Sequence, residues 1–275
     1  MEKPYALFDI QGQVVVVTGG TGVLGGAMVR YLAQMGARVV ILSRHAELSL
    51  AKAREIQENG GEAIGMAADI LDRTALEGAL EQSAAKWGPV DILINAAGGN
   101  QALATTSDTR PFFDLEWEAM ASVIDVNLAG TVRCCQVFGR SMASTGHGCI
   151  INIASMSAIR PLTRIPAYSA AKAAVMNFTQ WLATYMAREY SPQIRVNALA
   201  PGFFLTNQNR YLLEDAEHGT PTSRALQILE HTPMGRMGQP EDLLGPLHWL
   251  ISPASAFVTG IVIPVDGGFS AFGGL

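Results

Sequence analysis

Short runs of apolar, mostly β-branched residues recur along this chain, and longer stretches with helical periodicity lie between them. The runs predict seven strands, at Gln13–Thr18, Arg38–Leu42, Ala63–Ala67, Val90–Asn95, Cys149–Ile153, Ile194–Leu199 and Ile261–Val265. The stretches between the first four runs predict helices at Gly22–Met35, Glu47–Asn59 and Asp72–Trp87. Strands that are apolar almost throughout are buried on both faces, and helices between them indicate parallel crossovers. The pattern predicts an α/β fold, a doubly wound seven-stranded parallel sheet with helices on both faces.

No internal repeat and no linker rich in Pro, Gly or Ser divides the 275 residues, so we expect a single domain over residues 1–275. The longest irregular stretch covers about residues 203–232 and follows the sixth strand. Ligands of doubly wound sheets bind beyond the carboxyl ends of the strands. We therefore expect this insertion to overhang the binding cleft as a substrate lid, and a variable surface loop is the alternative interpretation.

Composition narrows the class of protein. Hydrophobic residues make up 49% of the chain and charged residues 16%, which argues against disorder. The net charge of −5 argues against a nucleic-acid-binding surface. The N-terminus lacks the apolar core of a signal peptide, and polar residues interrupt every apolar run. Three cysteines (Cys134, Cys135, Cys149) suit reduced, packed thiols, and neither they nor the five histidines have a metal spacing. We expect a cytoplasmic protein with no metal, membrane or nucleic-acid partner.

A glycine-rich loop follows the first predicted strand. Within Thr18–Gly25, the spacing Gly20-x-Gly22-x-x-Gly25 matches the dinucleotide fingerprint of Rossmann-like folds. Glycines allow a tight turn close to a pyrophosphate, and the next helix offers free N–H groups and the positive end of its dipole. The loop residues predicted to bind a dinucleotide are Gly19, Thr21, Gly22, Val23 and Leu24.

The ends of the next strands suggest which dinucleotide binds. Ser43 stands where many dinucleotide sites have an acidic residue that binds the adenosine ribose. Without a carboxylate there, a 2′-phosphate is not repelled and Arg44 could pair with it, which slightly favours NADP(H) over NAD(H). Further cofactor contacts are expected after the third and fourth strands, at Asp69, Ile70, Asn95, Ala96, Ala97 and Gly98.

A serine, a tyrosine and a lysine suggest the chemistry. Ser155 follows the fifth predicted strand, and Tyr168 and Lys172 lie one helical turn apart on a helix that starts near Pro166. A nearby ammonium stabilises phenolate, and lowering a tyrosine pKa by about three units requires about 4 kcal/mol. Tyr168 is therefore predicted to exchange a proton with a carbonyl oxygen, with Ser155 bonded to the same oxygen. Lys172 is the lone charged residue of Tyr168–Thr184, a helix expected to be buried nearly all round.

These motifs, together with Asn95–Gly98, Asn127 and Pro201-Gly202, resemble those of the short-chain dehydrogenase/reductase family from about Gln11 to Gly268. The resemblance implies a catalytic triad of Ser155, Tyr168 and Lys172. It also implies that Asn127 holds a water that relays protons to Lys172. Pro201, Gly202 and Thr206 would meet the nicotinamide. Members are often tetramers, so a homo-oligomer is expected, a tetramer or a dimer. One departure is that Val23 replaces a family glycine, and a glycine falls one position earlier, at Gly22.

The substrate is less closely defined, because the family's fold serves many substrates. Gly98–Asn100, Ala200–Leu213 and His231–Gly238 with Val265–Gly274 resemble the D-mannonate oxidoreductases of this family, which implies interconversion of D-mannonate and D-fructuronate, usually with NAD(H). Candidate substrate contacts are Asn100, Phe204, Gln208 and, for a carboxylate, Arg164 or Arg210, beside Ser155 and Tyr168. The alternative is another substrate, such as a 3-oxoacyl thioester, another polyol or a keto-sugar. More remote is a nucleotide-binding scaffold without catalysis.

Overall fold

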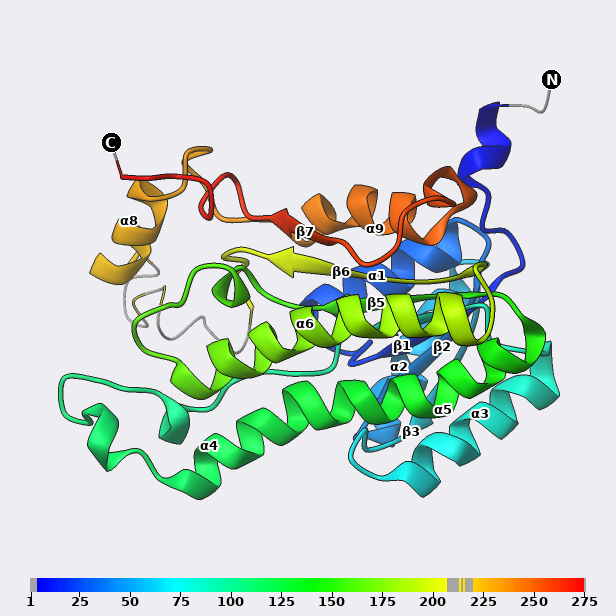
Figure 1. The fold of residues 1–275 in the computed structure, drawn as a ribbon, viewed down its shortest axis with the longest axis horizontal. Helices are drawn as coiled ribbons and strands as arrows, with labels where there is room; N and C mark the ends of the chain where they lie inside the picture. The colour runs from blue at the N-terminus through cyan, green and yellow to red at the C-terminus, as the bar shows by residue number, and fades with distance from the viewer. Residues whose placement is uncertain (1–3, 207–212, 214, 216–219, 275) are drawn as a thin grey trace.

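Seven parallel strands form one sheet through the computed structural model, which describes residues 4–206, 213, 215 and 220–274 (Figure 1). The strands are β1 (Val14–Thr18), β2 (Arg38–Ser43), β3 (Glu62–Ala67), β4 (Ile92–Asn95), β5 (Gly148–Ile153), β6 (Ile194–Pro201) and β7 (Val262–Val265). Their order is β3-β2-β1-β4-β5-β6-β7, and every neighbouring pair is parallel. The order runs in opposite directions from β1 and β4, which makes the sheet doubly wound.

Helices cover both faces of the sheet. The α-helices are α1 (Val23–Gln34), α2 (Ala46–Glu58), α3 (Arg73–Trp87), α4 (Trp117–Ile124), α5 (Gly130–Thr145), α6 (Pro166–Glu189), α8 (Ser223–Glu230) and α9 (Leu244–Ile251). A π-helical segment, η4 (Asp125–Ala129), joins α4 to α5. Short 3-10 turns are η1 (Pro4–Phe8), η2 (Ala102–Ala104), η3 (Phe112–Asp114), η5 (Met156–Ala158), η6 (Pro240–Leu243) and η7 (Pro253–Ser255). This arrangement is the predicted Rossmann-like architecture.

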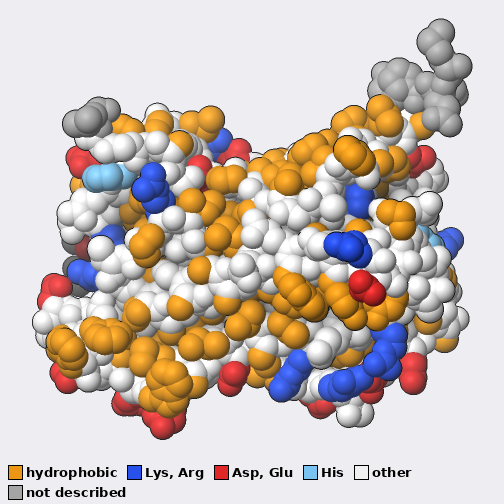
Figure 2. Space-filling view, in the orientation of Figure 1, with side chains coloured by type: hydrophobic (Ala, Val, Ile, Leu, Met, Phe, Trp, Pro, Cys, Tyr) orange, Lys and Arg blue, Asp and Glu red, His pale blue; other side chains and the backbone are white. Residues whose placement is uncertain are grey.

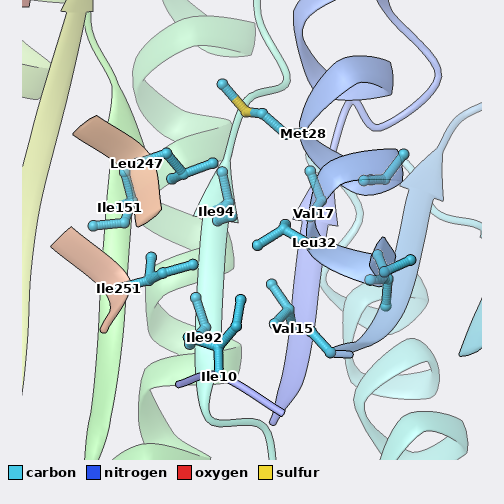
Figure 3. Packing of buried hydrophobic residues seen from close by; sticks show 14 of the residues in the cluster. Ile10, Val15, Val17, Met28, Leu32, Ile92, Ile94, Ile151, Leu247 and Ile251 are labelled. Atoms are coloured by element: carbon cyan, nitrogen blue, oxygen red, sulfur yellow. The ribbon is translucent and has the colours of Figure 1, made fainter. Parts of the chain in front are cut away.

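Alternate residues of each strand pack against opposite helical layers. Val15 and Val17 of β1 belong to a core shared with α1 and α9, whereas Val14 and Val16 belong to a core shared with α3, α5 and α6. Figure 3 shows the first core, with Met28, Leu32, Leu247 and Ile251 packed against strand residues that include Val15, Ile92, Ile94 and Ile151. Both faces are buried, as expected from strands that are apolar throughout.

The predicted strands agree with the observed ones to within two residues at each end. The irregular stretch predicted at 203–232 is wrong in part, because Ser223–Glu230 form α8. The side chain of Thr222 caps this helix by accepting the N–H of Ala225 at 3.2 Å. The three cysteines are buried and unbridged, as predicted, and burial raises the pKa of Cys149 to about 11.

The described residues contain neither a membrane-spanning helix nor a cluster of metal ligands. No described helix is both long enough and apolar enough to cross a membrane. Within the same residues, no three histidine, cysteine, aspartate or glutamate side chains come together in a way that could hold a metal ion.

The sheet brings the carboxyl ends of its central strands to one edge. Thr18 of β1 lies beside Asn95 of β4, and Asn95 lies beside Asn152 of β5. Ile153, the last residue of β5, lies beside Leu199 of β6. The segments that follow these strands therefore start side by side, and they carry most of the residues predicted to be functional.

Candidate active site

The glycine-rich loop turns tightly between β1 and α1. Gly19 has a φ of 67°, and its N–H donates to the Leu42 carbonyl of β2 at 2.8 Å. A Cβ on Gly19 would lie 2.8 Å from the Cα of Ala97, and one on Gly25 would collide with the Gly19 carbonyl oxygen. Both positions therefore need glycine, the first for its left-handed backbone and the second for the close approach of α1.

The N-terminus of α1 is open to an anion. Gly22 is its N-cap residue, no side chain caps it, and the first turn has no acidic residue. The first N–H groups of a helix have no partner within the helix, and its dipole favours negative charge there. Val23 is the first helical residue, and no non-glycine residue in the described chain has a positive φ. The missing family glycine thus falls where an ordinary residue fits.

Ser43 is the last residue of β2 and Arg44 follows it, so neither position at this strand end carries a carboxylate. The Ser43 hydroxyl donates to the His45 carbonyl at 3.0 Å and is 2.7 Å from the Ser49 hydroxyl. The side chain of Arg44 is exposed. Of the residues after β3, Asp69 is exposed and accepts the N–H of Leu71, and Ile70 is buried beneath α5 against Gly130.

Asn95 at the end of β4 belongs to the core, and the small residues that follow it are partly exposed. The side chain of Asn95 is buried and donates to Asn152 Oδ1 at 2.9 Å and to Cys135 Sγ at 3.3 Å. The Asn95 amide therefore holds β4 to β5 and α5, and the cofactor contact of this residue stays a prediction. Ala96, Ala97 and Gly98 are only partly buried, and the Ala97 N–H is anchored to Thr18 Oγ1 at 3.1 Å.

The predicted triad converges where β5 meets α6. Ser155 is nearly buried, and its hydroxyl oxygen accepts the N–H of Ser157 at 3.2 Å and the O–H of Ser157 at 3.0 Å. The ammonium of Lys172 is 3% exposed and donates to the Ile153 carbonyl at 2.7 Å. It lies 5.7 Å from the centre of the Tyr168 ring. The helical spacing therefore brings the pair together as predicted, one turn apart on α6.

Burial acts on the pKa values of both members of the pair. It raises the pKa of Tyr168, against a hydrogen bond from Ser155 that lowers it. It also lowers the pKa of Lys172 to about 8. The net shift in the pKa of Tyr168 is therefore opposite to the expected acidification of the phenol. The ammonium is directed at the Ile153 carbonyl, and loss of water disfavours the phenolate more than its neighbours favour it.

Asn127 lies in the π-helical η4 and is fully buried. Its Oδ1 accepts the Gly99 N–H at 3.1 Å, and its Nδ2 donates to the carbonyls of Gly99 and Val123. A Cβ on Gly98 would lie 2.6 Å from Asn127 Oδ1 and 3.3 Å from Lys172 Nζ, so the two side chains flank this glycine. The asparagine holds the Gly98-Gly99 turn in place, and the water relay stays a prediction.

A cavity of about 210 Å³ opens beside Ser155 and Tyr168. Asn100 and Phe204, both predicted to contact substrate, also line it. So does Arg224 of α8, which the sequence analysis missed because it expected no helix between residues 203 and 232. The sequence signal that could have found this helix is Thr222, a good N-cap residue placed just before an apolar pattern.

The cavity also reaches the predicted nicotinamide side of the site. Leu24 of α1, Pro201 and Gly202 at the end of β6, and Thr206 line it. The cavity therefore connects the first turn of α1 with Ser155 and Tyr168, and six of the predicted cofactor and catalytic residues line it.

A family model described as enoyl-(acyl carrier protein) reductase matches residues 11–270. The uncharacterized oxidoreductase UxuB of Bacillus subtilis is 47% identical over 276 residues, which cover 97% of this chain and 98% of that protein. A crystal structure of a candidate D-mannonate oxidoreductase from Haemophilus influenzae, with bound NAD, is 43% identical in sequence and has a TM-score of 0.91. The match covers 97% of this chain and 98% of the chain in that structure. The chain belongs to the short-chain dehydrogenase/reductase family. A gluconate 5-dehydrogenase of Burkholderia cenocepacia in complex with NADP and tartrate is also similar, with 33% identity, a TM-score of 0.87 and coverage of 98% of this chain and 100% of that one.

The predicted substrate contacts do not all lie at the cavity. Arg164 is not among the residues lining the cavity, and its guanidinium pairs with Asp108 Oδ1 at 3.3 Å on the surface. This arrangement does not favour the predicted role of Arg164 in binding a carboxylate, because its guanidinium is engaged outside the cavity. Gln208 and Arg210 lie outside the described residues.

The depressed pKa of Lys172 makes stability depend on pH. Below pH 8 the lysine is protonated in both states, and the cost of burying its charge is fully present. Between pH 8 and 10.5 the folded protein loses this proton while the unfolded chain keeps it, so the cost disappears. Relative to Lys172→Met, the wild-type free energy of unfolding should rise by about 3 kcal/mol across this range.

Urea unfolding of both proteins from pH 7 to 10.5 measures this difference. Titration of Tyr168 is common to the two proteins and largely cancels. Parallel curves for the two proteins would show that Lys172 has an ordinary pKa in the fold.

Proposed function

We propose that this protein is an NAD(P)-dependent oxidoreductase that interconverts D-mannonate and D-fructuronate, with Tyr168 as the proton donor and acceptor. The observation that carries the proposal is that the Ser155 and Tyr168 side chains line one cavity with Leu24 of α1, beside the anion-binding end of that helix. The two similar structures support the substrate class, because their names refer to a mannonate and a gluconate. The insertion at 203–232 would cover the substrate, since Phe204, Thr206 and Leu213 line the same cavity.

The described residues fit a dinucleotide. The uncapped end of α1 suits the pyrophosphate, and the small residues at 96–98 leave room along the sheet edge. Ser43 and Arg44 leave space and a positive charge for a 2′-phosphate. When bound, the nicotinamide supplies or accepts the hydride.

In the direction of reduction, the Tyr168 hydroxyl donates its proton to the carbonyl oxygen of the substrate. Ser155 accepts two hydrogen bonds from Ser157, so its own O–H is left to donate to the same oxygen or to the phenol. Negative charge then develops on the phenol oxygen, and the ammonium of Lys172 stabilises it from the next turn of α6.

The raised pKa of Tyr168 suits this direction. At neutral pH the phenol keeps its proton, which is the form that reduction consumes. Oxidation of the alcohol requires the phenolate, which the buried site disfavours. Lys172, with a pKa of about 8, is mostly protonated at neutral pH and can stabilise the phenolate that reduction leaves behind.

Replacing Tyr168 by Phe tests the proton transfer. The ring and its packing remain and only the hydroxyl is lost, so turnover of D-fructuronate should fall by about a hundredfold or more while cofactor affinity changes little. Oxidation of NADPH or NADH at 340 nm measures turnover, and quenching of cofactor fluorescence measures binding.

The matched control is Tyr190→Phe, which removes the hydroxyl of an exposed tyrosine at the end of α6 and should leave both quantities unchanged. Unchanged turnover in Tyr168→Phe would end the assignment of this residue.

Replacing Ser43 by Asp tests the cofactor preference. A carboxylate at the end of β2 would repel a 2′-phosphate and bond to a ribose hydroxyl, so kcat/KM for NADPH relative to NADH should fall about tenfold or more. Ser43→Ala is the control that removes the hydroxyl without adding charge. A wild-type protein that already prefers NADH strongly would show that Arg44 does not bind a phosphate.

We also propose that the protein is a homo-oligomer. Phe178, Trp181 and Tyr185 form a stacked row along α6, and Trp181 is 56% exposed. The expectation of a helix buried nearly all round is therefore wrong for one chain, and a second copy could cover this row. Figure 2 shows hydrophobic side chains gathered on this face of the molecule.

Replacing Trp181 by Glu should lower the molar mass measured by light scattering after size exclusion, because a charge would then be buried in the interface. Leu48→Glu, which changes an exposed leucine of α2, should leave the mass unchanged. A monomeric wild-type protein would contradict the proposal, as would an unchanged mass in the Trp181 variant.

A further inference from the structure

We propose that Arg224 binds the carboxylate of the substrate and that the side-chain oxygen of Asn100 accepts a hydrogen bond from a substrate hydroxyl. The cavity would thereby select acids that carry hydroxyl groups. The inference rests on the proposed function and adds to it the residues that choose the substrate.

Arg224 brings positive charge to a cavity that is otherwise mostly apolar. Among the described residues that line it, Arg224 is the only charged one, and its neighbours include Leu162, Ile165 and Phe204. A guanidinium beside apolar walls attracts a carboxylate more strongly than one in water, because fewer water molecules screen the pair. Arginine also offers paired N–H groups that match the two oxygens of a carboxylate.

Hydrophobic packing and an N-cap hold the helix that carries Arg224. Arg224 is the second residue of α8, and the next residue, Ala225, packs with Leu213 and Ile228 in a small hydrophobic cluster. Arg224 has another interaction in the structure, and its five N–H donors allow a substrate carboxylate to bind alongside that partner. The guanidinium is therefore carried on an ordered helix at the wall of the cavity.

Asn100 provides the second observation, an oxygen that needs a donor. The hydroxyl of Thr105 donates to the Gln101 carbonyl at 2.8 Å, so its oxygen can only accept from Asn100. The amide NH₂ of Asn100 must therefore face Thr105, which it reaches at 2.8 Å. This leaves Asn100 Oδ1 buried and without a partner among the described residues.

A buried acceptor without a partner is costly, and a ligand that donates to it removes that cost. Asn100 lines the cavity together with Ser155 and Tyr168, so a donor bound there would belong to the same molecule as the reacting carbonyl. A hydroxyl group of a sugar acid is such a donor, and the hydrocarbon part of an acyl chain is not. The cavity thus combines the guanidinium of Arg224, the acceptor oxygen of Asn100 and the hydroxyl groups of Ser155 and Tyr168.

Two substrates that share a carbon skeleton distinguish the contribution of Arg224 from that of Asn100. D-Fructuronate carries a carboxylate where D-fructose carries a hydroxymethyl group, and both have hydroxyls next to the carbonyl. Arg224→Gln should raise KM for D-fructuronate about ten- to a hundredfold and change that for D-fructose little. Asn100→Ala should raise KM for both substrates by a similar factor. Arg224→Lys keeps the charge without the paired donors and should fall between wild type and Arg224→Gln.

Arg73→Gln is the matched control, because it removes an exposed arginine of α3 that pairs with Glu77. Thermal unfolding and cofactor binding establish that each variant is folded. Equal losses on both substrates in Arg224→Gln, or no loss, would overturn the role of Arg224. An unchanged KM in Asn100→Ala would overturn that of Asn100. Failure of the wild-type enzyme to reduce D-fructuronate would instead overturn the proposed function.

Discussion

The hydrogen bond from the buried ammonium of Lys172 to the last carbonyl of β5 is the interaction on which the site depends. It joins α6 to the sheet at the point where Ser155 leaves the strand, so one contact of 2.7 Å ties the helix that carries Tyr168 to the strand end that precedes Ser155. A charge 3% exposed is costly to bury, which the depressed pKa of Lys172 reflects. The fold bears this cost between a strand end and the helix that carries the phenol.

A line of buried polar side chains keeps the strand ends aligned behind this contact. Asn95 of β4 donates to Asn152 of β5, and Asn152 donates to Thr179 of α6 at 2.9 Å. Hydrogen bonds in a dry interior are directional, so they fix the two strands and the helix relative to one another more closely than apolar packing alone does. The small residues after β4 and Ser155 after β5 begin at these strand ends, and β1, which leads into the glycine loop, lies beside β4.

The parts of the site that follow a regular period were predictable from the sequence, and the others were not. Tyr168 and Lys172 share a helix, so their spacing alone places them together. The sequence correctly predicted that a strand ends at Asn95. A short apolar run does not show whether the side-chain amide of its last residue faces the core or the cleft. Arg164 lies in a stretch without a clear period, whereas Arg224 lies in α8, whose N-cap Thr222 and apolar pattern are present in the sequence. The position of Arg164 depends on its contact with Asp108, which sequence spacing does not encode.

The pKa values of the catalytic pair depend on a balance that residue types alone do not determine. A lysine beside a tyrosine lowers the phenol pKa only if the charge interaction exceeds the loss of hydration of both groups. Here the ammonium is committed to the Ile153 carbonyl, and burial raises the pKa of the phenol. In the proposed reaction this leaves Tyr168 as an acid at neutral pH, with Lys172 placed to stabilise the anion formed on proton transfer. Burial, which opposes phenolate in the resting site, thereby keeps the donor protonated for the reduction of a carbonyl.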